Sequence, residues 1–253
     1  MKPTIVLIHG ATLNGASWAP VRRLLEPDFI VLTPDLPGHG SRRGEPFTLQ
    51  GAIDTVALAV KSVAPAPVIL AGDSLGGFTS QAAAAHLPQE QLKGLVLGGS
   101  SHEFIGAPAW PYLMKALMFR VILAIKDERK MVAAKIPGQL ANEFGLSPED
   151  VQATMDGGMC LSVFPQAVKA LHNVDLRSKL AAIRQPVLFV NGDDDKFHVR
   201  GEAAYVAAAQ NATIRRFPNC DHGVSLRRSA EFAALIRQFA LRVLAPQPVA
   251  SQA

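Results

Sequence analysis

The seven residues AGDSLGG, from Ala71 to Gly77, place a single serine among three glycines. The apolar run 67–70 precedes them, and the alanine-rich stretch 78–86 follows them. A short apolar run bounded by glycine is typical of a buried strand, and an alanine-rich stretch is typical of a helix. The sequence therefore predicts a sharp turn at Ser74, where a strand ends and a helix begins.

Residues Gly72 to Gly76 match the pattern G-x-S-x-G, in which a nucleophilic serine occupies a strained turn between a strand and a helix. The positions two before and two after the serine must then be small, which explains both glycines. A glycine-rich turn with a merely capping serine is the alternative interpretation. The strand before Ser74 and the helix after it favour the nucleophile.

The rest of the chain alternates strand-like and helix-like stretches. Near-continuous apolar strands separated by helices predict a mostly parallel sheet with both faces covered, an α/β fold. Expected strands are 4–8, 29–33, 68–71, 95–97, 186–190 and 213–217, and expected helices are 18–25, 48–63, 75–87, 201–209 and 229–244.

The alternation stops between residues 101 and 180, where only helical patterns occur, at 110–125, 128–134, 147–155 and 164–171. We interpret 101–180 as a helical cap inserted into a core formed by 1–100 and 181–245. Residues 246–253 are expected to be a disordered tail.

A serine hydroxyl needs a general base, and a base needs an orienting carboxylate. His222 follows the last expected strand, and the candidate acids Asp193, Asp194 and Asp195 follow the strand before it. The oxyanion formed from an attacked carbonyl needs N–H donors. We expect these to be the backbone amides of Leu75, next to the serine, and Ala11, in the loop after the first strand.

These stretches together resemble the α/β-hydrolase superfamily: HGATLNGASW, TPDLPGHGSR, GDSLGG, VNGDDD and DHG occur in order over most of the chain outside 101–180. The resemblance implies six parallel strands, the first of which corresponds to the family's third strand. It also implies a lid after the family's sixth strand. In the family's usual spacing the acid is the third residue after the glycine of the loop that follows the family's seventh strand. Counted from Gly192, this spacing selects Asp195. The opening loop is similar to that of small esterases and hydroxynitrile lyases, but Gly223 stands where the lyases have a lysine.

Composition limits the partners. The net charge is +4 with scattered lysines and arginines, so no nucleic-acid partner is expected. The two cysteines, Cys160 and Cys220, are far apart and have no metal-ligand spacing, so no metal and no other cofactor is expected. The sequence predicts no membrane-spanning stretch, so we expect no membrane partner and a cytoplasmic location. The oligomeric state stays open.

The predicted function is a serine hydrolase that cleaves a small, rather apolar carboxylic ester through an acyl-enzyme. Alternatives on the same triad are cleavage of a thioester, a lactone or a carbon–carbon bond, and cofactor-free perhydrolase or haloperoxidase activity. A ligand-binding receptor with little turnover is an alternative from another class. Expected substrate contacts are Thr12 and an apolar stripe of the cap, represented by Trp110, Met114 and Met118.

Overall fold

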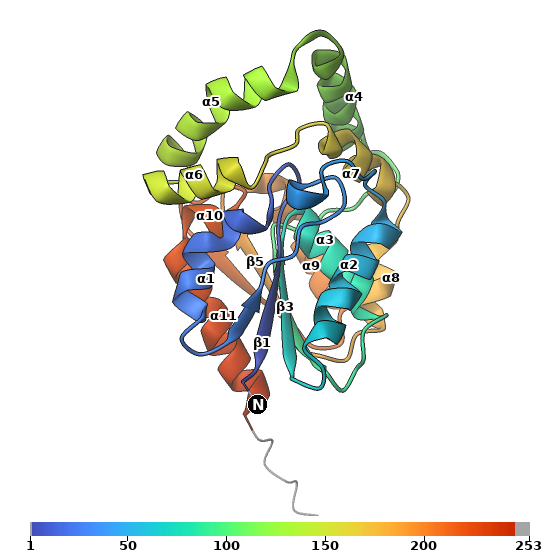
Figure 1. Ribbon diagram of the computed structural model, residues 1–253. Coiled ribbons are helices and arrows are strands. Elements are labelled where there is room, and N and C mark those ends of the chain that lie inside the picture. The colour runs from blue at the N-terminus through green and yellow to red at the C-terminus, as the bar shows by residue number, and fades with distance from the viewer. Residues whose placement is uncertain (1, 246–253) are drawn as a thin grey trace, which may run out of the picture.

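The computed structural model describes residues 2–245, which contain one six-stranded sheet (Figure 1). All neighbouring strands are parallel, in the order β2-β1-β3-β4-β5-β6. This confirms the predicted parallel α/β sheet. The strands are β1 (Thr4–Ile8), β2 (Ile30–Leu32), β3 (Val68–Asp73), β4 (Leu92–Gly98), β5 (Val187–Gly192) and β6 (Ala212–Phe217).

The central strands are buried on both faces, as their continuous apolar sequences require. Their register brings the carboxyl ends to one edge: Ile8 pairs with Gly72, Asp73 with Gly98, and Gly192 with Phe217. The loops that carry the candidate nucleophile, acid and base all leave the sheet at this edge. Parallel α/β sheets bind ligands there, outside the carboxyl ends of their strands.

Helices cover both faces of the sheet (Figure 1). The core on one face contains Trp18, Leu25 and Phe232, and the core on the opposite face contains Val56 and Phe78. The helices of the sheet layers are α1 (Ala19–Leu25), α2 (Leu49–Ser62), α3 (Leu75–Ala84), α8 (Leu176–Ala181), α9 (Lys196–Ala208), α10 (Val224–Arg227) and α11 (Ser229–Leu244), with the 3₁₀ turns η1 (Gly15–Trp18) and η2 (Gly40–Arg42).

Four further helices lie over the carboxyl edge of the sheet, at the top of Figure 1. They are α4 (Trp110–Ile125), α5 (Glu128–Asn142), α6 (Pro148–Asp156) and α7 (Val163–Leu171), preceded by η3 (Ala107–Ala109). Apolar side chains of α4, α5, α6 and their connecting loops form a small core of their own, to which Leu226 of α10 contributes. Helix α7 packs instead in the sheet core, through Val163, Ala167 and Leu171. The division into a core and a cap at residues 101–180 stays a prediction.

The structure differs from the expected elements in places that matter for the site. Helix α9 begins at Lys196, five residues before the expected start at Gly201. Gly201 lies inside the helix because its missing side chain lets the helix approach the Ser101 carbonyl. Helix α5 continues through Pro137, where the sequence predicted an end at 134. The tail 246–253 lies outside the described residues.

Candidate active site

Ser74 stands between β3 and α3 in a strained conformation, with φ 54° and ψ −118°. A side chain at Gly76 would collide with the Ile8 carbonyl, and one at Gly72 would collide with the backbone of Gly76. The two glycines are therefore needed for close packing of the turn, as the G-x-S-x-G pattern predicts. The hydroxyl is held at the carboxyl edge of the sheet, beside the amino-terminal end of α3.

The loop after β6 brings His222 to this serine. Nε2 of His222 lies 2.9 Å from the Ser74 Oγ, within hydrogen-bond distance. Gly223 follows in the left-handed conformation, with φ 85°, and begins α10. The arrangement is that of a hydroxyl whose proton an imidazole can accept.

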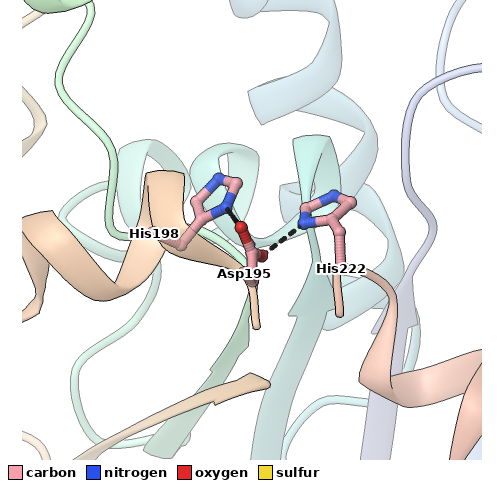
Figure 2. Close-up of side chains that lie close together, drawn as sticks. All are labelled: Asp195, His198 and His222. Carbon is pink, nitrogen blue, oxygen red and sulfur yellow. Dashed lines mark hydrogen bonds and ion pairs between the residues drawn. The ribbon is translucent and has the colours of Figure 1, made fainter. Parts of the chain in front are cut away.

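The structure brings one of the three loop aspartates to His222. Oδ2 of Asp195 lies 2.7 Å from the Nδ1 of His222 (Figure 2). Asp195 is buried, whereas Asp193 and Asp194 are exposed. The Asp193 and Asp194 amides donate to the Phe217 and Cys220 carbonyls. These two residues therefore tie the loop after β5 to the strand β6 and the loop that follows it.

Asp195 has a second histidine partner that the sequence analysis missed. Nδ1 of His198 lies 2.8 Å from each carboxylate oxygen of Asp195 (Figure 2). The His198 and His222 rings are stacked, with centroids 4.8 Å apart. The signal was present in the sequence, since residues three apart share a helix face, but it required placing the start of α9 at Lys196 rather than at Gly201.

The pKa shifts in this cluster indicate which of the three side chains carry a charge. Burial raises the pKa of Asp195, but hydrogen bonds from His198 and His222 outweigh it, so the pKa falls well below its usual range. Burial lowers the pKa of His198 to about 4 despite the nearby carboxylate, so its imidazole is neutral. Burial also disfavours charge on His222, but the hydrogen bond and charge of Asp195 prevail and raise its pKa. His222 is therefore the ring in which a positive charge is stabilised.

The expected oxyanion donors lie next to the serine. Leu75 is the first residue of α3, and Ala11 lines the same cavities as Ser74. A side chain at Gly10 would contact the Ser74 Cβ at 3.5 Å, so the loop after β1 packs directly against the nucleophile. Among the hydrogen bonds of residues 2–245, neither the Ala11 amide nor the Leu75 amide is a donor. Both are therefore free to bind a negative oxygen.

Two buried histidines shape the loop that carries Ala11. Nε2 of His9 accepts from the Leu36 amide at 3.1 Å, and Nε2 of His39 accepts from the Thr12 amide at 3.3 Å. Burial lowers the pKa of His39 to about 3, so this ring is a neutral acceptor. These histidines hold the loop in place and do not contact Ser74 by any described hydrogen bond.

Two cavities, of about 210 and 500 Å³, open onto Ser74 and His222. Thr12 lines both cavities, and its contact with a substrate stays a prediction. Ile136 and Gln139 of α5 also line both, and apolar side chains such as Phe119 and Phe144 enclose the remainder. The cavities are mainly apolar, and their lining comes from the helices over the sheet edge and from the strand-end loops.

The expected contacts from α4 require a correction. Trp110, Met114 and Met118 line neither cavity, and all three side chains are exposed. Helix α4 meets the larger cavity with another face, through Pro111, Tyr112, Lys115 and Phe119. Helix α4 is apolar nearly all round, so the periodicity of its sequence does not distinguish its inner face from its outer face.

The ligand atoms of Asp195, His198 and His222 lie within 4.8 Å of one another, a spacing that a metal ion would tolerate. In this arrangement both Nδ1 atoms hydrogen-bond to the carboxylate, and Nε2 of His222 faces Ser74. A cation bound here would have to displace these hydrogen bonds, so the cluster fits an orienting network better than a metal site.

Comparisons with known proteins find similar sequences and a similar fold. The chain is 27% identical over 259 residues to a pimeloyl-[acyl-carrier protein] methyl ester esterase of Pseudoalteromonas atlantica, covering 95% of each chain. It is also 27% identical to the protein of that name from Stenotrophomonas maltophilia, covering 94% of this chain and 92% of that one. A bromoperoxidase structure from Bacillus anthracis shares the fold, with a TM-score of 0.77 at 20% identity, covering 95% of this chain and 92% of that one.

A family model matches residues 5–235, which include every candidate residue of the site. The sheet order, the turn at Ser74 and the positions of Asp195 and His222 lie within that match. The chain is a member of the alpha/beta hydrolase family.

Proposed function

We propose that this protein is a serine hydrolase that cleaves a small, rather apolar carboxylic ester through an acyl-enzyme. The observation that carries the proposal is the hydrogen-bonded series Ser74–His222–Asp195, with Nε2–Oγ at 2.9 Å and Nδ1–Oδ2 at 2.7 Å. Ser74 sits at the meeting point of two mainly apolar cavities, which suit an ester with short apolar groups.

In the first half-reaction, the Ser74 Oγ attacks the ester carbonyl while Nε2 of His222 takes the hydroxyl proton. The carbonyl oxygen becomes an oxyanion, and the Ala11 and Leu75 amides donate to it. The Asp195 carboxylate stabilises the imidazolium of His222. The carbon–oxygen bond to the alcohol then breaks, His222 gives its proton to the leaving oxygen, and the acyl group remains on Ser74.

In the second half-reaction, His222 accepts a proton from water as the water oxygen attacks the acyl carbon. The oxyanion forms again between the same two amides. Its collapse breaks the bond to the Ser74 Oγ, which takes back the proton from His222. The products are a carboxylic acid, an alcohol and the free enzyme.

The names of the two relatives support methyl esters of carboxylic acids as the first substrates to test. By volume, a small alcohol fits the smaller cavity of about 210 Å³, and the acyl chain fits the larger one of about 500 Å³. This division of the ester between the two cavities is part of the proposal.

The test is a panel of p-nitrophenyl and methyl esters with acyl chains of two to ten carbons. We expect steady turnover, retained in the presence of a chelator, and its loss in Ser74→Ala. A single burst of alcohol without further turnover would instead favour a ligand-binding receptor. Turnover lost on chelation and restored by one divalent ion would contradict the metal-free mechanism.

A further inference from the structure

Helix α4 carries a stripe of large apolar side chains that face away from the protein. Successive side chains of this stripe are four, three, one, three and four residues apart in the sequence, which places all of them on one side of the helix. All are exposed, from 49% for Met118 to 80% for Ile125. We call this set the α4 stripe; its members are Trp110, Met114, Leu117, Met118, Val121 and Ile125.

The other side of α4 is already used. Phe119 packs against Phe164 of α7 with the two rings tilted and their centroids 4.9 Å apart, and Ala116 is buried. Tyr112 and Lys115 line the larger cavity. Packing within the protein therefore accounts for one face of α4. Among residues 2–245, Leu117 of the α4 stripe lines a groove beside α7, and the rest of the stripe is exposed.

The length and composition of this segment correct an expectation from the sequence. Residues Ala107–Ile125 form a continuous 19-residue helical segment with mean hydropathy 1.3, of which 11% is buried. Such a segment is long and apolar enough to cross a membrane, although none had been expected. Because its inner face packs on α7 and lines the cavity, this helix fits a position along a membrane surface better than one across the membrane.

The segment that carries the stripe, from α4 through α5, has a predominantly positive charge. Residues 110–142 contain six basic side chains and two acidic ones, and none of the six basic groups forms an ion pair within the described part of the chain. The two acidic groups accept backbone hydrogen bonds, Asp127 from Lys130 and Glu128 from Ser162. The basic residues are Lys115, Arg120, Lys126, Arg129, Lys130 and Lys135.

We propose that the α4 stripe binds the surface of an anionic lipid bilayer, with α4 lying in the interface. Apolar side chains with a tryptophan on one face and lysines and arginines beside them are the features of an interfacial helix. Arg120 and Lys126 can extend to lipid headgroups while the stripe enters the acyl boundary. The expectation of no membrane partner is the competing prediction, and the test below decides between the two.

A second copy of the chain is a poorer fit for the same face. A two-fold contact would place the stripe of one copy on that of the other, with Arg120 and Lys126 of both copies brought close together. An anionic surface instead neutralises these charges. The position also suits an apolar ester, because Pro111 and Phe119 of the same helix line the cavity that leads to Ser74.

The test uses the two tryptophans of the chain. Trp110 is 62% exposed in the stripe, whereas Trp18 is 2% exposed in the core. With vesicles of phosphatidylcholine and phosphatidylglycerol (7:3), we expect the protein to float with the lipid and its tryptophan emission to shift to the blue. Trp110→Phe should abolish the shift and retain most of the flotation. Vesicles of phosphatidylcholine alone should bind at least tenfold less.

The variant Met118→Glu/Val121→Glu should lower the bound fraction at least tenfold, while its turnover of a water-soluble ester is unchanged. Leu58→Glu is the control, since Leu58 is an apolar residue on α2 that is at least as exposed as the stripe residues replaced, and this variant should bind like the wild type.

Three results would overturn the proposal. The first is no flotation with anionic vesicles. The second is equal loss of binding in Leu58→Glu and the stripe variant. The third is evidence that the stripe binds protein and not lipid. Such evidence would be a dimer that Met118→Glu/Val121→Glu dissociates, or binding of purified acyl carrier protein by a chain that does not bind vesicles.

Discussion

The Asp195 carboxylate is shared between two stacked histidines, and the second of them, His198, contacts both of its oxygens at 2.8 Å. His198 is buried and neutral, so its Nδ1–H donates to the carboxylate without competing for positive charge. On its other side, Nε2 lies 3.4 Å from the Tyr112 hydroxyl of α4. We infer that His198 is a positioning residue, which holds Asp195 toward His222.

Replacing His198 should therefore alter the rate and the pH profile together. His198→Phe removes one hydrogen bond to a charged group, worth about 1.5–3 kcal/mol, so kcat should fall on the order of 10- to 100-fold. With one donor fewer, Asp195 interacts more strongly with His222, and the acid limb of kcat/KM should move to higher pH. His198→Asn, whose amide can occupy the place of Nδ1–H, should restore much of the rate. Equal losses in both variants with an unmoved pH profile would indicate a packing role only.

The three aspartates of the loop after β5 should differ sharply in importance. Asp195→Asn leaves the geometry intact but removes the charge that stabilises the imidazolium, so kcat should fall about 10⁴-fold. Asp193→Asn and Asp194→Asn are matched controls, because both side chains are exposed and neither contacts His222 through a described hydrogen bond. Initial rates on one ester suffice for the comparison. A loss larger in either control than in Asp195→Asn would show that the acid is assigned to the wrong residue.

The pH dependence should report the titration of His222. This residue is a base only when neutral, and Asp195 raises its pKa above the ordinary value of 6.5. As the pH falls through that raised pKa, His222 becomes protonated and kcat/KM should decrease tenfold per pH unit. The His198 and His39 pKa values, about 4 and about 3, lie too low to produce this limb. A midpoint clearly below 6.5 in the free enzyme would contradict the assignment.

The lining of the cavities should determine the preferred acyl length. Ile136 lines both cavities, whereas Met118 lies outside them. Ile136→Ala should change the ratio of kcat/KM for hexanoate and acetate esters by about tenfold, the scale on which one or two methylenes are distinguished in an apolar pocket. Met118→Ala, measured on the same water-soluble esters, is the control and should leave the ratio unchanged. A larger change of this ratio in Met118→Ala than in Ile136→Ala would indicate that Met118 lines the pocket.

Local sequence patterns predicted the sheet and the turn at Ser74 because both depend on neighbouring residues. Glycines at 72 and 76 are required by contacts within the turn, and buried parallel strands are apolar along their whole length. His222 and Asp195 were found through their order after successive strands, since the carboxyl ends of parallel strands meet at one edge. Family spacing was needed to choose among three adjacent aspartates.

Features that depend on tertiary packing were not predicted. The orientation of α4 was missed because the helix is apolar on both sides, and only its packing on α7 determines which side faces the cavity. His198 was missed because Gly201 was expected to start the helix, whereas Gly201 packs inside it against Ser101. In both cases the deciding contact joins residues far apart in the sequence.

The central claim is that Ser74 becomes covalently acylated, and one measurement tests it directly. The protein is treated with a fluorophosphonate, digested, and the labelled peptide is identified by mass spectrometry. We predict one label per chain, on Ser74, with none on a folded Ser74→Ala variant that has lost ester turnover by about 10⁴- to 10⁶-fold. A label on another residue, or ester turnover undiminished in Ser74→Ala, would contradict the account.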